Sequence, residues 1–261
     1  EIYQERKRLI KRAEFLKASL KALKDPLIRQ AEYLNKLADK IIKYDVLKVQ
    51  IENPKGLNTK FYSTELLQDI NFFLSLTSKN GGIIVGQLTD MFERIETIKK
   101  DILHNLGNLH EYIRTQEKNI IILNEPIGDY LFQINANGYE SLKSTEIWKD
   151  IFIKHKNYEN QRIKTLPSNK ADHIIPLQDQ CAKVMGQGMG GVIYKNLIYL
   201  ENIYDEIEDR LKFISDIMSD NSESMQKSKK LCEDLIDILN TSNESTSLYS
   251  TNPKKSSLLE K

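Results

Sequence analysis

The stretch LTDMFERIETIKKDILHNLGNLHEYI, residues 88–113, decides the fold class. Apolar side chains recur along it at steps of three and four, namely Leu88, Phe92, Ile95, Ile98, Ile102, Leu106, Leu109 and Ile113. Only a helix with 3.6 residues per turn places such a series on one face. The opposite face carries charged side chains such as Arg94 and Lys99. We therefore expect a coiled-coil-like helix of about 35–40 residues, longer than a compact domain of this size is wide.

A second stripe of the same period begins near the start of the chain. It runs from Leu9 to Ile41 and is interrupted at Asp25-Pro26. Asp favours the helix N-cap and Pro fits the first helical turn, so the interruption indicates a kink or a restart. Because the stripe resumes in phase, we expect one long, kinked helix.

Breaks in the apolar pattern divide the rest of the chain. Turn-forming residues mark breaks at 53–56, 78–82, 126–128, 166–170 and 186–191. Between them we expect shorter helices at 63–75, around Trp148 and at 175–184. A long apolar stripe follows from Ile193 to about Ile238, with an interruption at the polar residues 219–224. No segment convincingly has the alternating period of a strand. The sequence predicts an all-α protein of elongated bundles of long, kinked helices.

The end of the chain differs in composition from the rest. Residues 241–261 are rich in Ser, Thr and Asn and poor in apolar side chains. Such a segment buries too little apolar surface to fold on its own. We therefore expect one elongated helical domain over residues 1–240 and a disordered tail over 241–261.

Charge is balanced over the whole chain but not along it. The 261 residues include 38 Lys/Arg and 37 Asp/Glu, a net charge of +1, so we expect no nucleic-acid partner. Residues 1–24 carry eight Lys/Arg against three Glu, whereas residues 201–240 carry eleven Asp/Glu against five Lys/Arg. We interpret these segments as solvated helix faces that also pack together in one bundle. The alternative is a basic, membrane-facing surface on the first helix.

Nothing in the sequence predicts catalysis. The four histidines lack the spacing of a metal site, and no motif supplies an activated nucleophile. Gly186, Gly188 and Gly191 match the spacing of the dinucleotide fingerprint, but a helix rather than a strand is expected before them, which favours a simple turn. Cys181 and Cys232 are isolated and are expected to be reduced thiols in the core. We expect neither a metal nor a cofactor, and no enzymatic activity.

The sequence has no membrane or secretory signal. No run approaches the ~20 apolar residues that span a bilayer, and the opening residues have no apolar signal segment. The first residue is not Met, which indicates a piece of a longer protein. We expect a cytoplasmic protein whose contact with membranes is at most peripheral.

Three short stretches carry a family resemblance. They are IYQERKRLIK at 2–11, LHEYIRTQEKN at 109–119 and GGVIYKNL at 190–197. The first resembles the opening helix of the V domain of Alix-like proteins, which follows the Bro domain. The second is similar to the family's long-arm helix, in which glutamine and acidic residues precede an aliphatic run. The third resembles its pattern of glycine, aromatic pair, polar residue and leucine, with the aliphatic Ile193 at a position that is usually aromatic.

The resemblance implies two helical arms joined in a V and a non-enzymatic adaptor in endosomal, multivesicular-body cargo sorting. V domains of this family bind Tyr-Pro-x-Leu peptide motifs in an apolar pocket on one arm, for which Ile193, Tyr194 and Leu197 are the candidates here. Some also bind ubiquitin through the first helices, where Ile2 and Leu9 share a face. The implied partners are ubiquitin or ubiquitinated cargo, such peptides and, through the parent protein, ESCRT components at the endosome.

Two other kinds of protein fit the same helical pattern. Long kinked helices and a basic first segment are typical of a BAR-type dimer that shapes membranes, which would bury several thousand Å² between subunits. A spectrin-like or coiled-coil tethering scaffold would need no peptide pocket. An enzyme is the least favoured class, because no constellation of residues supports one.

Overall fold

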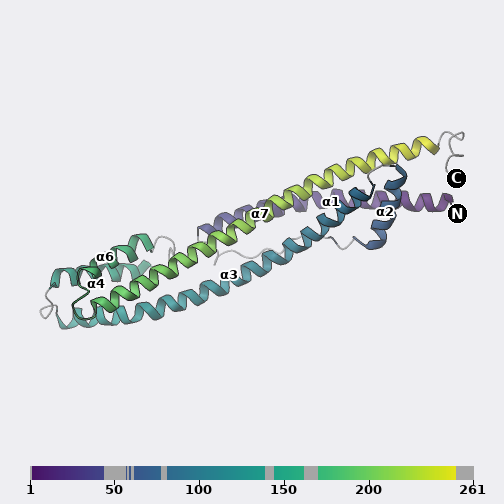
Figure 1. Ribbon diagram of the computed structural model, residues 1–261. Helices are drawn as coiled ribbons and strands as arrows, with labels where there is room; N and C mark the ends of the chain where they lie inside the picture. Colours follow the sequence, from purple (N-terminus) through teal and green to yellow (C-terminus); the bar gives the residue numbers. More distant parts are fainter. Residues whose placement is uncertain are drawn as a thin grey trace. The chain divides into compact units, whose positions relative to one another are not determined.

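The computed structural model describes residues 2–43, 57, 59, 62–77, 81–138, 144–161 and 170–250, with side chains for all of these except 2, 76–81, 161 and 243–250. Its elements are α1 (Ile2–Ile42), α2 (Thr64–Thr77), α3 (Gly81–Asn137), α4 (Thr145–Gln161), the π-helical turn η2 (Lys170–Ile174), α6 (Ile175–Ala182) and α7 (Gly190–Ser250) (Figure 1). No strand occurs among the described residues. The all-α fold expected from the helical stripes is confirmed.

The chain divides into two compact units, each assembled from segments that are distant in sequence. Unit 1 comprises Glu1–Lys36, Gln50–Leu103 and Met218–Lys261, and unit 2 comprises Leu37–Val49 and His104–Ile217. Helices α1, α3 and α7 therefore contribute to both units. Helix α2 belongs to unit 1, and α4, η2 and α6 belong to unit 2.

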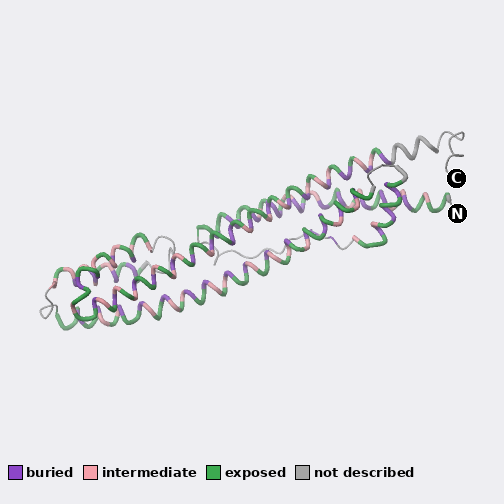
Figure 2. The backbone as a smooth tube through the Cα atoms, in the orientation of Figure 1, coloured by how far each residue is buried: buried purple, intermediate pink, exposed green. Residues whose placement is uncertain are grey.

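The core of unit 1 is formed by apolar side chains from four helices. Its buried members include Leu16, Leu20, Leu27 and Leu34 of α1, Ile70 and Leu74 of α2, Phe92 and Ile95 of α3, and Met225 and Cys232 of α7. Buried positions recur at regular steps along each helix, as the period of the sequence predicts (Figure 2). Burying these surfaces stabilises the unit by about 25 cal/mol for each Å² of apolar area removed from water.

The core of unit 2 combines apolar and polar side chains. Its apolar members include Ile41 of α1, Leu106, Leu109 and Ile113 of α3, Trp148 and Ile151 of α4, Leu177 and Cys181 of α6, and Ile193, Leu197 and Leu200 of α7. Asn124, His155, Tyr158 and Tyr204 are also buried there. Polar groups inside a core must find partners, so this part of unit 2 needs a specific arrangement of its side chains.

Helix α3 is longer than its stripe predicts, with 57 residues rather than about 35–40. The expected break at 126–128 is wrong, because Pro126 lies inside the helix. Proline removes the hydrogen bond to the carbonyl four residues earlier. That carbonyl belongs to Ile122, which is 63% exposed, so the lost hydrogen bond falls on an exposed part of the helix. The same reasoning applies to Pro26 inside α1, whose stripe continues in one helix as expected.

Helix α7 is also continuous where the sequence indicates an interruption. Residues 219–224 are helical, and Ser222 is buried rather than part of a polar break. Its hydroxyl donates to the Ala31 carbonyl oxygen at 2.8 Å, which makes a serine acceptable between two helices. The helix continues through Ser250, so residues 241–250 are helical although the expected tail begins at 241. Residues 251–261 of that expected tail lie outside the described residues.

The glycine cluster joins α6 to α7. Turn residues occupy 183–189, and α7 begins at Gly190. Gly188 has φ +51°, and a Cβ at Gly190 would collide with the Val184 carbonyl oxygen. Both glycines are thus required by backbone geometry. The preceding element is helical, so the turn expected from the sequence is confirmed.

The basic first segment and the acidic last segment meet in unit 1. Lys24 of α1 and Glu233 of α7 form an ion pair with an Nζ–Oε1 distance of 2.8 Å. The pair holds the pKa of Glu233 below its usual value and raises the pKa of Lys24, chiefly through the hydrogen bond between them. The expectation that the two charged segments pack together is therefore confirmed at this contact.

Candidate functional site

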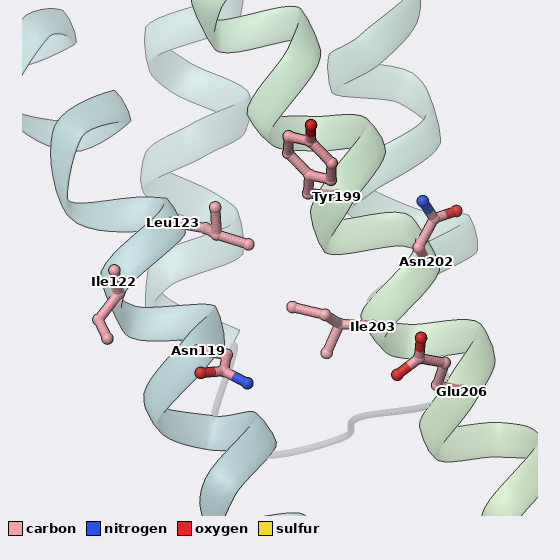
Figure 3. Close-up of a pocket in the computed structure, with 7 residues that line it drawn as sticks. All are labelled: Asn119, Ile122, Leu123, Tyr199, Asn202, Ile203 and Glu206. Atoms are coloured by element: carbon pink, nitrogen blue, oxygen red, sulfur yellow. The ribbon is translucent and has the colours of Figure 1, made fainter.

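A surface groove of unit 2 lies between α3 and α7. It has a volume of about 420 Å³ and is open to solvent. Its lining residues are Asn119, Ile122 and Leu123 of α3 and Tyr199, Asn202, Ile203 and Glu206 of α7 (Figure 3). Its volume lies within the range of natural ligand sites, about 300–1,000 Å³.

Aliphatic side chains form the middle of this groove. Leu123 and Ile203 point toward each other from the two helices, and Tyr199 lies beside them on α7 (Figure 3). Ile122 is 63% exposed and Tyr199 is 46% exposed. Large apolar side chains left this open on neighbouring turns are typical of a surface that receives a partner.

A series of polar groups lies at the end of the groove formed by Asn119 and Glu206 (Figure 3). Asn119 donates its Nδ2 hydrogen to Gln116 Oε1 at 2.9 Å. The Tyr112 hydroxyl interacts in turn with Gln116 and with the carboxylate of Glu206, and burial raises the pKa of Tyr112. Because a carboxylate only accepts hydrogen bonds, Glu206 can act only as an acceptor toward the Tyr112 hydroxyl. The polar groups thus extend from Asn119 to Glu206.

The surface position of these apolar residues follows from the sequence. Ile120, Ile121, Ile122 and Leu123 are consecutive, and four consecutive helical residues extend over about 300° of the helix circumference. One face can bury only part of such a run. Ile120 is 3% exposed in the core, whereas Ile121 and Ile122 are 43% and 63% exposed. The run therefore indicates more apolar surface than the core can bury. The three-and-four period of the apolar residues does not by itself predict this exposed surface.

A buried polar network lies behind the groove. Asn124, which follows Leu123, donates to Glu159 Oε1 at 2.8 Å, and its Oδ1 lies 3.0 Å from His155 Nε2. Since Glu159 fixes the orientation of the Asn124 amide, His155 must donate through Nε2. Tyr204, which follows Ile203, shares a 2.9 Å hydrogen bond with Tyr158. The backbone that carries the groove is therefore anchored on both helices.

The peptide-site residues expected from the sequence lie next to this groove rather than in it. Ile193 and Leu197 are 1% and 0% exposed and pack in the core of unit 2. Tyr194 is half-buried, so it is the member of the three that retains surface for a partner. None of the three lines the groove, which begins at Tyr199. The sequence analysis named none of the residues that line the groove.

The two residues expected to bind ubiquitin are placed differently. Leu9 is 3% exposed and belongs to the core of unit 1. Ile2 begins α1, but its side chain lies outside the described residues. The large exposed side chains of this part of α1 are Tyr3 at 77% and Phe15 at 49%. A partner that binds this helix would contact those two residues instead of Leu9.

The described residues offer no evident reactive centre. Burial raises the pKa of the Cys181 and Cys232 thiols to about 12, which leaves both thiols protonated and unreactive at neutral pH. His155, expected at a surface or core edge, is 4% exposed within the buried network. No group of three or more His, Cys, Asp or Glu side chains able to hold a metal ion occurs in the part of the chain that the structure describes. Over the same residues, every helix is too short or too polar to cross a membrane.

Comparisons of the chain with models of known families, with curated proteins and with solved structures give no significant match.

Proposed function

We propose that this chain is a non-enzymatic adaptor that binds Tyr-Pro-x-Leu-type peptide motifs in the α3–α7 groove of unit 2, in the context of endosomal cargo sorting. The observation that supports peptide binding is the groove itself, an open cleft of about 420 Å³ with aliphatic, aromatic and amide side chains. The sorting context rests on the resemblance to the V domains of Alix-like proteins.

The groove has the chemistry that an extended peptide requires. Leu123 and Ile203 can receive an aliphatic side chain, and the Tyr199 ring can contact an aromatic or proline ring. Asn119 and Asn202 carry amide groups that can bond to peptide backbone. Tyr194 lies about one helical turn before the groove and can extend the contact along α7.

Ubiquitin binding is proposed on the exposed face of α1 in unit 1. Tyr3 and Phe15 supply apolar surface, and Lys7 and Lys11 are exposed between them. Titration of labelled ubiquitin with the protein should cause chemical-shift changes that Tyr3→Arg reduces. A titration without shifts at high protein concentration would remove ubiquitin from the partners.

The peptide proposal is tested by affinity measurements on two matched variants. Ile122→Asp places a charge in the groove, and Ile153→Asp makes the same change on α4, where Ile153 is 56% exposed and outside the groove lining. Ile122→Asp should weaken binding of a labelled Tyr-Pro-x-Leu peptide at least tenfold, because the peptide must then desolvate a carboxylate. Ile153→Asp should bind like the unmodified protein.

The controls separate folding from binding. Both isoleucines are exposed, so circular dichroism and the melting temperature of the two variants should match those of the unmodified protein. Equal peptide affinity in all three proteins would exclude this groove as the binding site.

A further inference from the structure

Glu206 gives the groove an acidic end. Of the seven residues that line the groove, Glu206 is the one that carries a formal charge. It is exposed, and within the described part of the chain no Lys or Arg forms an ion pair with it. Arg210, one turn further along α7, has its guanidinium carbon 5.7 Å from the centre of the Phe213 ring. Arg210 also acts electrostatically on Tyr112, which interacts with Glu206, so this cation lies nearby without forming an ion pair with the carboxylate.

The surrounding part of α7 strengthens this negative end. Residues 197–209 include five Asp or Glu and no Lys or Arg. Lys170 of η2 contacts two of them, with Nζ 3.8 Å from Glu201 Oε1 and in direct contact with Asp205. Glu206, which borders the groove, is not among the ion-pair partners of Lys170.

Polar groups lie beside Glu206. The Tyr112 hydroxyl interacts with its carboxylate and with Gln116, and Asn119 donates to Gln116. An ionised carboxylate only accepts hydrogen bonds, so Glu206 favours a partner that brings hydrogen-bond donors.

We infer that the groove selects peptides in which a Lys or Arg lies next to the apolar anchor, with Glu206 as the specificity-determining residue. This inference rests on the proposed peptide-binding function. The aliphatic middle of the groove receives the anchor, and the basic side chain extends to the Glu206 carboxylate. A peptide with an acidic residue at that position meets repulsion from Glu206 and from the neighbouring acidic turn of α7.

The test uses labelled ten-residue peptides with one Tyr-Pro-x-Leu core. They differ only in carrying Lys, Gln or Glu immediately before or immediately after the core. Fluorescence anisotropy with the full chain should give the lowest Kd for the Lys peptide and the highest for the Glu peptide on one side of the core. Successive peptides should differ about threefold in Kd, as expected for an exposed ion pair. The differences should vanish at about 1 M salt, where charges are screened within about 3 Å.

Two isosteric variants identify the responsible carboxylate. Glu206→Gln should remove the preference for Lys over Gln while retaining affinity for the Gln peptide. Glu208→Gln neutralises an exposed carboxylate two residues away that does not line the groove, and it should retain the preference. Lys preference that persists in Glu206→Gln would overturn the inference.

The remaining outcomes distinguish this inference from the proposed function. If the three peptides bind equally and Ile122→Asp abolishes binding, the groove binds peptides but does not discriminate between them by charge. Only the inference then fails. If no peptide binds in a way that depends on Ile122, the proposed function fails and the inference fails with it. If Glu206→Gln changes self-association in sedimentation experiments instead of peptide affinity, the occupant is a second copy of the chain and the inference is overturned.

Discussion

The two units have cores of different chemistry, although the same three long helices build both. In unit 1 the polar contacts have partly exposed partners or are single, as in the Asp69 ion pairs with Arg8 and Arg12 and the Ser222 bond to Ala31. In unit 2 the contacts of Asn124 with His155 and of Tyr158 with Tyr204 join side chains that are buried on both sides. A hydrogen-bond network of buried groups permits one arrangement of its members. The groove lies in the unit that contains this network.

This difference gives the groove a structural basis. Leu123 and Ile203 line it, and the next residue of each helix, Asn124 or Tyr204, is anchored in the network. A recognition surface binds more tightly when its backbone is already held in the bound geometry. The network of unit 2 thus lies directly beside the residues of the proposed binding surface.

The largest expected effects are equal in the two units. Leu20→Ala in unit 1 and Leu197→Ala in unit 2 each remove a fully buried leucine, and each should lower the free energy of unfolding by about 3 kcal/mol. Urea unfolding followed by circular dichroism measures both. Because Leu197 is also an expected peptide contact, the variant has a second use. A Leu197→Ala protein with unchanged stability and lost peptide affinity would assign Leu197 to the partner rather than to the core.

A polar truncation should separate the units. Asn124→Ala leaves a buried imidazole without one partner and should cost about 2 kcal/mol. Ser222→Ala removes one hydroxyl from a carbonyl of a helix and should cost about 1 kcal/mol or less. The same unfolding experiment measures the difference. Equal costs would contradict the distinction between the two cores.

The smallest expected effect is the pH dependence of the ion pair in unit 1. The folded-state pKa of Glu233 is below its ordinary value of 4.5, so the pair stabilises the protein above that pH and the contribution is lost as the pH falls through the folded value. Lys24 has a folded-state pKa above 10.5, so its contribution is present below that pH and is lost as the pH rises further. The stability difference between the unmodified protein and Glu233→Gln should therefore be constant between about pH 5 and 10 and disappear in acid. A difference that stays constant as Glu233 becomes protonated in the folded protein would contradict the pairing.

The sequence predicts the helices better than their ends. The steps from Leu88 to Ile113 predict α3 because a 3.6-residue period has one physical interpretation. The sequence did not predict its continuation through Pro126, because a proline in the sequence does not reveal that the hydrogen bond it removes belongs to an exposed residue, Ile122. The buried position of Ser222 was missed for a similar reason. Its partner, the Ala31 carbonyl, is distant in sequence.

The groove was less predictable than the helices. A stripe predicts which residues face the core, and Ile193, Leu197 and Ile203 all belong to one stripe. Of these, Ile203 is the residue that lines the groove, because α3 and α7 separate there enough to leave it half-buried. The spacing between two helices is a tertiary property that no single helix encodes. The aliphatic run at 120–123 was the available local signal, since it exceeds what one face can bury.

The central claim, that the groove of unit 2 binds a peptide, is tested most directly by hydrogen–deuterium exchange of the full chain with and without a saturating Tyr-Pro-x-Leu peptide. The account predicts slower exchange in peptic fragments that contain 119–123 and 199–206, and unchanged exchange across α2 and the unit 1 part of α1. Protection confined to fragments outside the groove, or no protection at saturation, would contradict it.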